Sequence, residues 1–425
     1  MKRINCNLID VCTKITDGAH WSPKSVKEGI PMASVKDMTD FGFNIESCRK
    51  ISEEDYKKLV KNDCKPLKND ILIAKDGSYL KHVFVWKEEK DLAILSSIAI
   101  LRPNLEKIDS AYLAKYLQSP FVKKSMANYV SGAAIPRIIL KDFKQFSISI
   151  PKKINEQKNI AIILSNYDGL IENNEKRIKV LENIAKLIYE EWFVRFKFPG
   201  HEKVKMIDSE TEFGIIPEGW KVKPFSDFCS KITDGTHEVI KPVKDGFYMV
   251  SATNLKDGFI DFSRTHFISE KDHKKIMLRS KPEKGDILFS KIGTIGNIAV
   301  VKQDFEFSIK NIALFKPLSN ELSSFIYSYF NNDSNLANFS TKASGTSQKF
   351  FSLAFLRNMN MVYPEEKIIL NFDRVVCPIL EQRHILNKKN QNLRKTRDLL
   401  LPKLISGEID VTKLDIKLNQ EIVNT

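Results

Sequence analysis

KITDGAH at residues 14–20 and KITDGTH at residues 231–237 are almost the same heptapeptide, repeated at a distance of 217 positions. Only the sixth residue differs, alanine in one copy and threonine in the other. Two interpretations fit such a pair: a catalytic signature used twice, or a module that the chain contains twice. Only the second interpretation predicts that the similarity extends, in the same order, well beyond the motif.

The similarity does extend along both halves of the chain. Further matching pairs are GIPMAS (29–34) with GFYMVS (246–251), ISEEDYKK (51–58) with ISEKDHKK (268–275), KPLKNDILIAKDGSYLK (65–81) with KPEKGDILFSKIGTIGN (281–297), and SGAAIPR (131–137) with SGTSQKF (344–350). The offset falls from 217 to 213 in steps of one or two residues, as small insertions and deletions in loops would produce. The sequence therefore predicts two copies of one module, an internal repeat with pseudo-twofold character.

Length and composition limit the possible classes of protein. A chain of 425 residues is too long for one compact core and suggests two or three domains. No apolar run approaches the roughly 20 residues that cross a bilayer, and the first residues lack the apolar core of a signal peptide. The six cysteines are scattered without a C-x-x-C pair, which argues against a disulfide framework and a cysteine-rich zinc site. We therefore expect a cytoplasmic protein.

The charge balance is the informative part of the composition. Lysine and arginine exceed aspartate and glutamate by 14. Such an excess favours a polyanionic partner, of which nucleic acid is the first candidate. A lysine-rich composition that merely reflects an AT-rich genome is the alternative explanation.

Each copy is expected to begin with a globular part and to end in a long helix. In the first copy, residues 71–75, 82–86 and 146–151 have the apolar composition of short strands, and residues 111–130 are helical in pattern. After Pro151 and Pro364 the composition changes to long polar helices. The predicted fold class is α+β, with two homologous α/β domains and two long helices.

Heptad spacing defines these helices, of which the first is expected from about residue 156 to residue 195. Its apolar rows are Leu164, Ile171, Ile178 and Ala185, and Tyr167, Asn174, Leu181 and Ile188. The rows of the second helix are Ile379, Leu386, Leu393 and Leu400, and the more polar Arg383, Asn390, Arg397 and Leu404. A polar residue such as Asn174 within an apolar row typically fixes register. Pro378 is expected to start or kink the regular part of the second helix.

A helix of about 40 residues spans roughly 58 Å, which is too long for an element inside one domain. The simplest prediction is that the two helices pair in antiparallel orientation as a coiled coil that separates the two domains. The alternative is that each helix packs on its own domain as an ordinary bundle helix.

The segments around the helices complete a recognisable pattern. They are EEWFVRFKFPG (190–200), IPEGW (216–220) and LLPKLISGEI (400–409). With the duplication, and with KIGTIG and SGTSQK in the second copy, they make the whole chain resemble the specificity (S) subunit of a type I restriction-modification enzyme. In the first copy KDGSYLK lacks the second glycine of KIGTIGN, and SGAAIPR lacks the Thr-Ser-Gln of SGTSQKF. Such divergence is expected if the two copies read different DNA sequences.

The resemblance implies a domain plan. It consists of target recognition domain 1 at residues 1–151, spacer helix 1 at 152–196, a linker at 197–219, target recognition domain 2 at 220–364, and spacer helix 2 with a tail at 365–425. The plan places the two recognition domains on either side of a coiled coil.

The resemblance also implies a function in host defence. The chain would be a non-catalytic subunit that binds double-stranded DNA at a bipartite, asymmetric target, with one half-site for each recognition domain. It would scaffold two methyltransferase (M) subunits and the restriction (R) subunits of a type I site-specific deoxyribonuclease and adenine-N6 methyltransferase. Those partners would use S-adenosylmethionine, ATP and Mg²⁺, and this chain would bind none of them.

The residues themselves indicate no catalytic or metal-binding centre. Asp70 with Lys75, and Asp286 with Lys291, have the residue types of a nuclease site. The residue two positions before each lysine is apolar, so the second metal-binding carboxylate of that site is missing. The sequence also contains no G-x-x-x-x-G-K-[ST] loop, no H-E-x-x-H and no adenine-methylation motif. We expect instead that each aspartate ends a turn before a buried strand.

The repeated heptapeptide is interpreted as a scaffold element. Asp17-Gly18 and Asp234-Gly235 are expected to form a tight turn, in which glycine supplies a positive φ and aspartate caps the backbone. A purely structural role is the first interpretation, and contact of the following histidine with DNA is the second. Catalysis is disfavoured because no other acid, base or nucleophile recurs with the motif.

Residues that contact DNA are expected on loops, since side chains at base edges specify a sequence while phosphate contacts position the domain. The candidates are His20, Trp21, Lys36, Lys75, Ser78, Lys81 and Arg137 in the first copy, and His237, Asn254, Lys291, Thr294, Asn297, Thr346, Gln348 and Lys349 in the second. For each of them a solvated surface role is the alternative, and Trp21 could equally cover the domain core. The helix positions expected at the spacer and subunit interface are Ile171, Asn174, Ile178, Leu181, Ile188, Leu386, Asn390, Leu393 and Leu400.

Two other functions stay open at this stage. One is a coiled-coil adaptor or scaffold without DNA binding, whose domains bind protein. The other is a nuclease with an unrecognised site. Sequence-specific DNA binding separates the first from a specificity subunit, and DNA cleavage by this chain alone would support the second.

Overall fold

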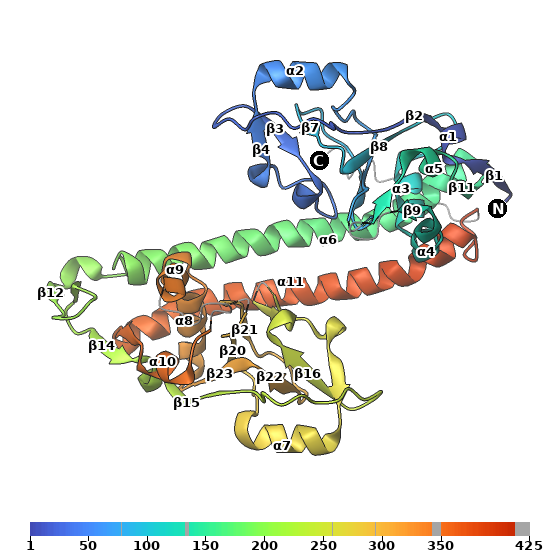
Figure 1. Ribbon diagram of the computed structural model, residues 1–425. Coiled ribbons are helices and arrows are strands. Elements are labelled where there is room, and N and C mark those ends of the chain that lie inside the picture. Colours follow the sequence, from blue (N-terminus) through green and yellow to red (C-terminus); the bar gives the residue numbers. More distant parts are fainter. Residues whose placement is uncertain (78, 132–135, 257, 294, 342–349, 413–425) are drawn as a thin grey trace. The chain divides into compact units, whose positions relative to one another are not determined.

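The computed structural model describes residues 1–77, 79–131, 136–256, 258–293, 295–341 and 350–412. The chain forms two compact units, of which unit 1 comprises Met1–Asn174 with the segment from Lys389 onward, and unit 2 comprises Glu175–Lys388. Each unit contains one globular domain and one part of each of two long helices, α6 (Ile154–Tyr189) and α11 (Glu366–Ser406) (Figure 1).

The domain of unit 1 is built on two small sheets. The first has the order β2 (Cys12–Asp17), β8 (Ile98–Pro103), β5 (Ile71–Ala74), β6 (Val83–Val85), and the second has the order β4 (Arg49–Ile51), β3 (Ile30–Ala33), β7 (Ala93–Ile94). Two-stranded pairs are formed by β1 (Arg3–Asn7) with β11 (Ser147–Pro151) and by β9 (Val130–Ser131) with β10 (Arg137–Ile138). The helices are α1 (Leu8–Val11), α2 (Glu53–Lys61), α3 (Ser110–Gln118), α4 (Pro120–Met126) and α5 (Leu140–Lys144).

The domain of unit 2 repeats this arrangement. Its sheets have the orders β15 (Cys229–Asp234), β23 (Ile312–Pro317), β20 (Ile287–Ser290), β21 (Ile298–Val300) and β19 (His266–Ile268), β16 (Phe247–Ser251), β22 (Ser308–Lys310). The two-stranded pairs are β14 (Lys221–Pro224) with β24 (Asn360–Tyr363), β17 (Leu255–Lys256) with β18 (Phe259–Ile260), and β12 (Met206–Asp208) with β13 (Ile215–Pro217). The helices are α7 (Glu270–Ser280), α8 (Asn320–Phe330), α9 (Asp333–Thr341) and α10 (Leu353–Asn358).

The predicted duplication and the α+β fold class are confirmed by strand register as well as by strand order. The pairing of β2 with β8 shifts between Cys12 and Lys14, and the pairing of β15 with β23 shifts between Cys229 and Lys231. A bulge re-aims the side chains that follow it. Both copies therefore present the residues of the repeated heptapeptide with the same register.

The strands predicted before Lys75 and Lys291 are present, and all four residues of β5 and of β20 are buried. The turn before each strand is also confirmed. Asp70 accepts a hydrogen bond from the backbone of Leu67 at 2.8 Å, and Asp286 accepts one from the backbone of Glu283 at 2.7 Å. Asp70 also receives two hydrogen bonds of 2.9 Å from the guanidinium of Arg102 rather than pairing with Lys75. The nuclease-like spacing of these residues is thus part of the scaffold.

The two long helices pair in antiparallel orientation in unit 1. Asn174 Nδ2 donates to Asn390 Oδ1 at 2.8 Å, and Asn390 Nδ2 donates to the carbonyl of Ile171 at 3.2 Å. Two turns further along α11, Arg397 Nη1 donates to Asp168 Oδ1 at 2.7 Å. A buried polar pair is satisfied in one register only, so these contacts fix how the helices align.

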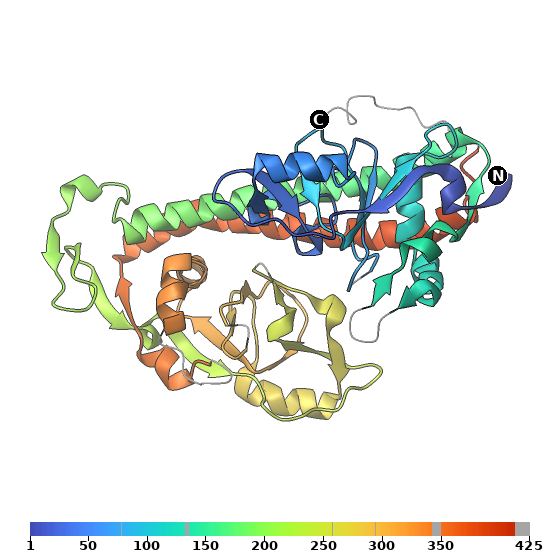
Figure 2. The same ribbon diagram turned by 45° about the horizontal axis from the view of Figure 1, so that its top comes forward.

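The same rule holds in unit 2. Arg383 is 4 % exposed, and its Nη1 donates to Glu182 Oε1 at 3.2 Å and to the hydroxyl of Tyr327 at 2.7 Å. Further along, the rings of Tyr189 on α6 and Phe372 on α11 lie 6.3 Å apart. The predicted antiparallel pairing is therefore confirmed within each unit, and Figures 1 and 2 show α6 in green beside α11 in red.

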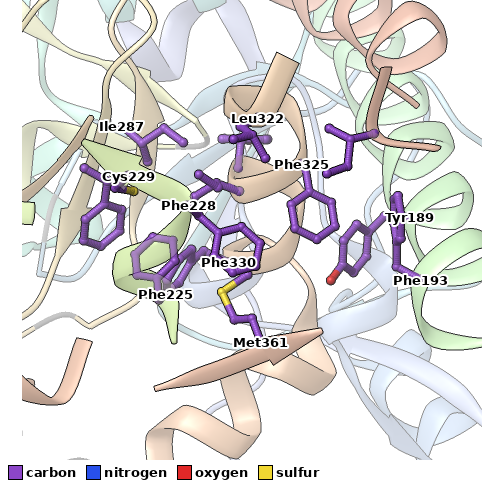
Figure 3. Packing of buried hydrophobic residues seen from close by; sticks show 14 of the residues in the cluster. Tyr189, Phe193, Phe225, Phe228, Cys229, Ile287, Leu322, Phe325, Phe330 and Met361 are labelled. Atoms are coloured by element: carbon purple, nitrogen blue, oxygen red, sulfur yellow. The ribbon is translucent and has the colours of Figure 1, made fainter. Parts of the chain in front are cut away.

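Each helix also packs on a domain, so the alternative interpretation is partly right as well. In unit 2, Tyr189 and Phe193 at the end of α6 enter the domain core, where the ring of Phe193 lies 4.9 Å from that of Phe325 (Figure 3). In unit 1, Leu164 of α6 and Leu404 of α11 belong to the core of the first domain. The helices are thus continuous with the cores rather than hinged to them.

The first long helix has close to its predicted bounds, whereas the start of the second needs correction. Helix α6 ends at Tyr189 and continues as a π-helical turn over Glu190–Val194. Pro378 does not start the second helix, since α11 begins at Glu366 and runs through the proline. A proline removes one backbone donor and crowds the preceding turn, but neighbouring packing can hold such a helix together. Val376 and Leu380, which flank it, are buried in the core of unit 2.

The expectation of a tight turn at Asp-Gly is wrong. Gly18 and Gly235 do not have a positive φ, and their amides continue the strand by donating to Ile98 O at 3.1 Å and Ile312 O at 2.9 Å. Glycine is required for another reason. A Cβ atom on Gly18 would lie 2.2 Å from a backbone carbonyl oxygen, and one on Gly235 would lie 2.1 Å from another. The motif therefore marks a close approach of two backbone segments.

Gly18→Ala and Gly235→Ala are each expected to lower the free energy of unfolding by about 1–3 kcal/mol, because the new methyl group overlaps backbone that cannot move aside. Gly169→Ala is the control. Gly169 lies on the exposed surface of α6, and a Cβ atom added there would have no neighbouring atom within 4 Å. That change should stabilise the chain by roughly 0.5–1 kcal/mol through helix propensity. Urea unfolding of the three variants measures both effects. Equal stability of all three variants would contradict the inference that Gly18 and Gly235 are required by a close approach of two backbone segments.

Candidate nucleic-acid interface

A buried ion pair lies under the repeated heptapeptide of unit 2. Asp234 ends β15 and is 2 % exposed, and Lys291 directly follows β20 and is 6 % exposed. The Nζ of Lys291 lies 2.8 Å from Asp234 Oδ2. The same carboxylate contacts His237 Nε2 at 2.9 Å and pairs with Arg279 of α7. Three basic side chains thus converge on one buried aspartate.

The equivalent residues form the same centre in unit 1. Asp17 ends β2, and it pairs with Lys75, which directly follows β5 and is 6 % exposed. His20 Nε2 lies 3.1 Å from Asp17 Oδ1, and the histidine side chain is mostly exposed. We call Asp17–Lys75 and Asp234–Lys291 the Asp–Lys centres. Each centre holds a surface histidine at the exit of the motif.

The lysine of each centre also joins two loops. In unit 1 the backbone of Ile138 donates to Lys75 O at 3.1 Å, and Gly77 donates to Pro136 O at 2.8 Å. In unit 2 the backbone of Phe351 donates to Lys291 O at 2.9 Å. The segments after β5 and β20 are therefore tied to the ends of SGAAIPR and SGTSQKF, directly above the ion pair.

The electrostatics of the centre in unit 2 favour the charged form of the aspartate. Burial by itself raises the pKa of Asp234, but the hydrogen bond and charge of Lys291, together with His237 and Arg279, outweigh it. The pKa of Asp234 consequently lies below its usual value. A permanent negative charge is thus kept below the loops and holds the cations in place.

Comparison with known proteins identifies this architecture. A family model for the type I restriction modification DNA specificity domain matches residues 6–183 and 217–390. The chain belongs to the type I restriction-modification specificity family. Each copy of the specificity domain contains one Asp–Lys centre, and the resemblance inferred from the sequence is confirmed.

Relatives within the family cover most of the chain. The chain is 29 % identical over 321 residues to the type I restriction enzyme MjaIX specificity subunit of Methanocaldococcus jannaschii, a match that covers 71 % of this chain and 70 % of that protein. It is 24 % identical to the HindI specificity subunit of Haemophilus influenzae, with 80 % and 87 % covered. The crystal structure of a type I S subunit from M. genitalium has a TM-score of 0.59 at 17 % identity and covers 95 % of this chain, so it shares the fold.

Several predicted DNA-contacting residues of the specificity domains are committed to internal contacts. Lys75 and Lys291 are the buried members of the Asp–Lys centres. Asn254 is 3 % exposed, its Oδ1 accepts from the backbone of Ser251 at 2.8 Å, and its Nδ2 donates to the carbonyl of Asp261 at 3.2 Å. Asn297 Nδ2 donates to the carbonyl of Leu255 at 2.9 Å. In this structure these four side chains make contacts within their own domain, and their contact with DNA stays a prediction.

Other candidates do face solvent. Trp21 is 51 % exposed, which excludes it as a cover of the domain core. Lys36 and Lys81 are exposed, and exposed Arg137 lies 3.2 Å from Asp76. The remaining candidates Ser78, Thr294, Thr346, Gln348 and Lys349 lie outside the described residues. The exposed candidates and the two histidines stay predictions for DNA contact.

Sequence reasoning missed Asn311, which the fold places beside His237, and four exposed lysines that follow the two histidines in the sequence. Asn311 Oδ1 lies 2.6 Å from His237 Nδ1, and its backbone has a φ of 57°. Lys24 and Lys27 are exposed after His20, and Lys241 and Lys244 are exposed after His237. These lysines recur at the same offset of 217 residues as the heptapeptide, so the sequence repeat could have revealed them. The sequence carries no comparable signal for Asn311.

The predicted spacer and subunit-interface positions lie mainly within the helix pair. Ile171, Ile178, Leu386 and Asn390 are buried, and Asn174, Leu181, Ile188, Leu393 and Leu400 are partly buried. The outer face of α6 instead exposes Val180, Ile184 and Leu187 at 58 %, 40 % and 58 %. The heptad residues therefore hold the helices together, and the row of Val180, Ile184 and Leu187 stays exposed to solvent.

Two further observations describe the chemistry of the specificity domains. Within the described ranges, no three His, Cys, Asp or Glu side chains gather in a way that could hold a metal ion. Neither α6 nor α11, nor any other helix of the described residues, has the length and apolarity to cross a membrane.

Asp234→Asn is expected to lower the free energy of unfolding by roughly 3–5 kcal/mol at pH 7, because it leaves Lys291 buried without its counter-charge. The folded-state pKa of Asp234 lies below its unfolded value of about 3.9. The stabilisation is therefore present above that value and is lost as the pH falls through the folded pKa. Urea unfolding should show the wild type and the variant converging on acidification.

Exposed Asp245→Asn is the matched control and should change stability little at either pH. Asp234→Asn combined with Lys291→Met removes both buried charges and should recover part of the loss. If Asp234→Asn behaved like Asp245→Asn, the centre would not stabilise the fold.

Proposed function

We propose that the chain is the non-catalytic DNA-recognition subunit of a type I restriction-modification complex. Each specificity domain reads one half-site of a bipartite, asymmetric target in double-stranded DNA. The same chain scaffolds two methyltransferase subunits and the restriction subunits. Family membership supports DNA specificity, and the two-copy architecture supports a bipartite target.

The observation that carries the proposal is the combination of a constant support with variable loops. Both copies place an aspartate and a lysine under the junction of two loops, with a histidine at the exit. The sequence that begins at this lysine is KDGSYLK (75–81) in the first copy and KIGTIGN (291–297) in the second. A protein that reads two different DNA sequences needs such an arrangement, because base edges are read by side chains on a fixed frame.

Catalysis and cofactors are assigned to the partners. The sequence has no phosphate-binding loop for ATP and no motif for S-adenosylmethionine or adenine methylation. The carboxylates that resembled a nuclease site pair with Arg102 in unit 1 and with Lys316 in unit 2. Partner subunits then supply S-adenosylmethionine chemistry, ATP hydrolysis and Mg²⁺-dependent cleavage.

Replacing residues 220–364 with the corresponding domain of another family member is expected to change one half-site and to leave the other unchanged, because each domain has its own core and its own loops. The measurement is methylome sequencing of cells that carry the intact system with either version. The control is replacement of residues 1–151, which should change only the other half-site.

A change in both half-sites on a single replacement would contradict one domain per half-site. An intact complex that methylates no defined sequence would favour the coiled-coil adaptor instead. DNA cleavage by the purified chain with Mg²⁺ alone would contradict the non-catalytic assignment.

Binding of DNA by the assembled complex should depend strongly on salt, because neutralised phosphates release counterions at a log–log slope of about −0.9 per contact. Lys81→Ala should make the slope shallower by about one contact if Lys81 binds a phosphate. Lys61→Ala on the exposed surface of α2 is the matched control. Filter binding at salt concentrations from about 50 to about 300 mM measures the slope for each variant. A slope near zero would refute docking through phosphates.

A further inference from the structure

The end of α6 has an unusual backbone. After the π-helical turn Glu190–Val194, the amide of Arg195 donates to Glu190 O at 2.8 Å, and the amide of Lys197 donates to Glu191 O at 2.6 Å. Between these two residues Phe196 has a φ of 56°. These hydrogen bonds span five and six residues, so each is longer by one residue or more than a bond of the α-helix. The left-handed residue that ends a helix is usually glycine.

A phenylalanine in this position costs conformational energy that glycine would avoid. The other long helix uses the ordinary solution, since Gly407 follows α11 with a φ of 86°. The ring of Phe196 packs edge-on against Trp220 at 5.5 Å and is only partly buried. A strained, partly exposed aromatic residue at a π-helical turn is the kind of feature that recurs at functional sites.

Phe196 lines a cavity of about 250 Å³ within unit 2. The cavity is bounded by the segment 195–204, which includes the 3-10 turn His201–Lys203, and by the hairpin of β12 and β13. Its lining is Arg195, Phe196, Lys197, Phe198, His201, Val204, Met206 and Pro217. The lining is therefore mainly aromatic and aliphatic, with Phe196 and Phe198 as its floor. The basic side chains of Arg195, Lys197 and His201 also belong to it and form its basic wall. Trp220 stacks on Phe198 at 5.1 Å and anchors this floor to the core of unit 2.

Apolar side chains are exposed on the same segments that line the cavity, and one of them, Met206, belongs to the lining. Val194 is 45 % exposed, Met206 is 49 % exposed, Ile207 is 40 % exposed and Ile215 is 61 % exposed. Aromatic residues, methionine and arginine are enriched in protein interfaces. An apolar group of this extent, next to a preformed cavity, is typical of a docking site for another protein.

Charge indicates which partner fits. Residues 195–205 contain Arg195, Lys197, Lys203 and Lys205 against the carboxylate of Glu202, and Arg195 also pairs with Glu191 of the preceding helical turn. We propose that this cavity docks a segment of the methyltransferase subunit in which an apolar side chain is flanked by carboxylates. The apolar side chain fills the space over Phe196 and Phe198, and the carboxylates face Lys197. The inference rests on the proposed function, for which it names one docking site.

The observations favour a protein segment over nucleic acid. The hairpin beside the basic stretch carries Asp208, Glu210, Glu212 and Glu218. A polyphosphate of uniform negative charge would be repelled along that edge, whereas a peptide can present carboxylates to one edge and neutral or basic groups to the other. The exposed Met206 and Ile207 also contribute apolar area, which nucleic acid backbones do not match.

The test measures binding of the purified methyltransferase subunit, encoded with this chain, to the full-length chain by calorimetry in the absence of DNA. Phe196→Gly removes the ring but suits the left-handed backbone, so the variant should fold with a Tm within a few degrees of the wild type. We expect it to weaken binding at least tenfold. Lys197→Glu should weaken binding to a similar extent, and its loss should shrink as salt is raised.

Two substitutions on α7 of the same unit are matched controls. Lys271→Glu reverses the charge of an exposed lysine, and Leu278→Ala shortens an apolar side chain that is 87 % exposed. Both should bind the methyltransferase subunit like the wild type. Unchanged binding by Phe196→Gly and Lys197→Glu, while the wild type binds, would overturn the docking site and leave the proposed function intact. Failure of the wild type to bind any methyltransferase subunit would instead count against the proposed function.

A second readout separates protein from nucleic acid. If Lys197→Glu weakened binding of mixed-sequence DNA to the chain and left the methyltransferase affinity unchanged, the basic wall would be a phosphate contact, and the inference would be wrong. If the variants assemble at raised protein concentration and then methylate the same target sequence, docking is separate from base recognition, as we expect.

Discussion

A buried aspartate paired with a buried lysine is the interaction on which the junction of the loops in each domain depends. Taking two charges out of water costs several kcal/mol per ion, and the cost is offset only while the partners stay together. Asp234 and Lys291 come from strands that are distant in sequence, so their attraction holds the heptapeptide against the loop after β20. The loops above such a support can vary in sequence without loss of the frame.

The close packing of backbone beside the pair adds a second constraint. Gly18 and Gly235 allow a neighbouring strand to approach so near that no side chain fits. The glycine and the ion pair together explain why Asp-Gly occurs in both KITDGAH and KITDGTH. The agreement reflects packing and charge rather than catalysis, and the histidine at the end is held in place by the same aspartate.

The long helices combine two roles that first looked like alternatives. Their heptad rows pair with each other through Asn174 and Asn390 in unit 1 and through Glu182 and Arg383 in unit 2. Their ends enter the domain cores, where Phe193 lies against Phe325. Within each unit, the part of a helix that shares the core of the domain is held in place by that core.

The sequence by itself determined the duplication, the α+β class, the buried strands before Lys75 and Lys291, and the pairing of the helices. These features are periodic or repeated, and burial imposes such patterns directly on the chain. Only the tertiary structure decided which polar residues face solvent. Asn254 and Lys291 look like surface residues in a loop-rich sequence, yet their hydrogen bonds and ion pairs turn them inward. Long-range partners such as Asn311 for His237, and the left-handed Phe196 above a cavity, depend on segments that meet only on folding. No local pattern encodes those meetings, because the energy that fixes them comes from contacts between residues far apart in the chain.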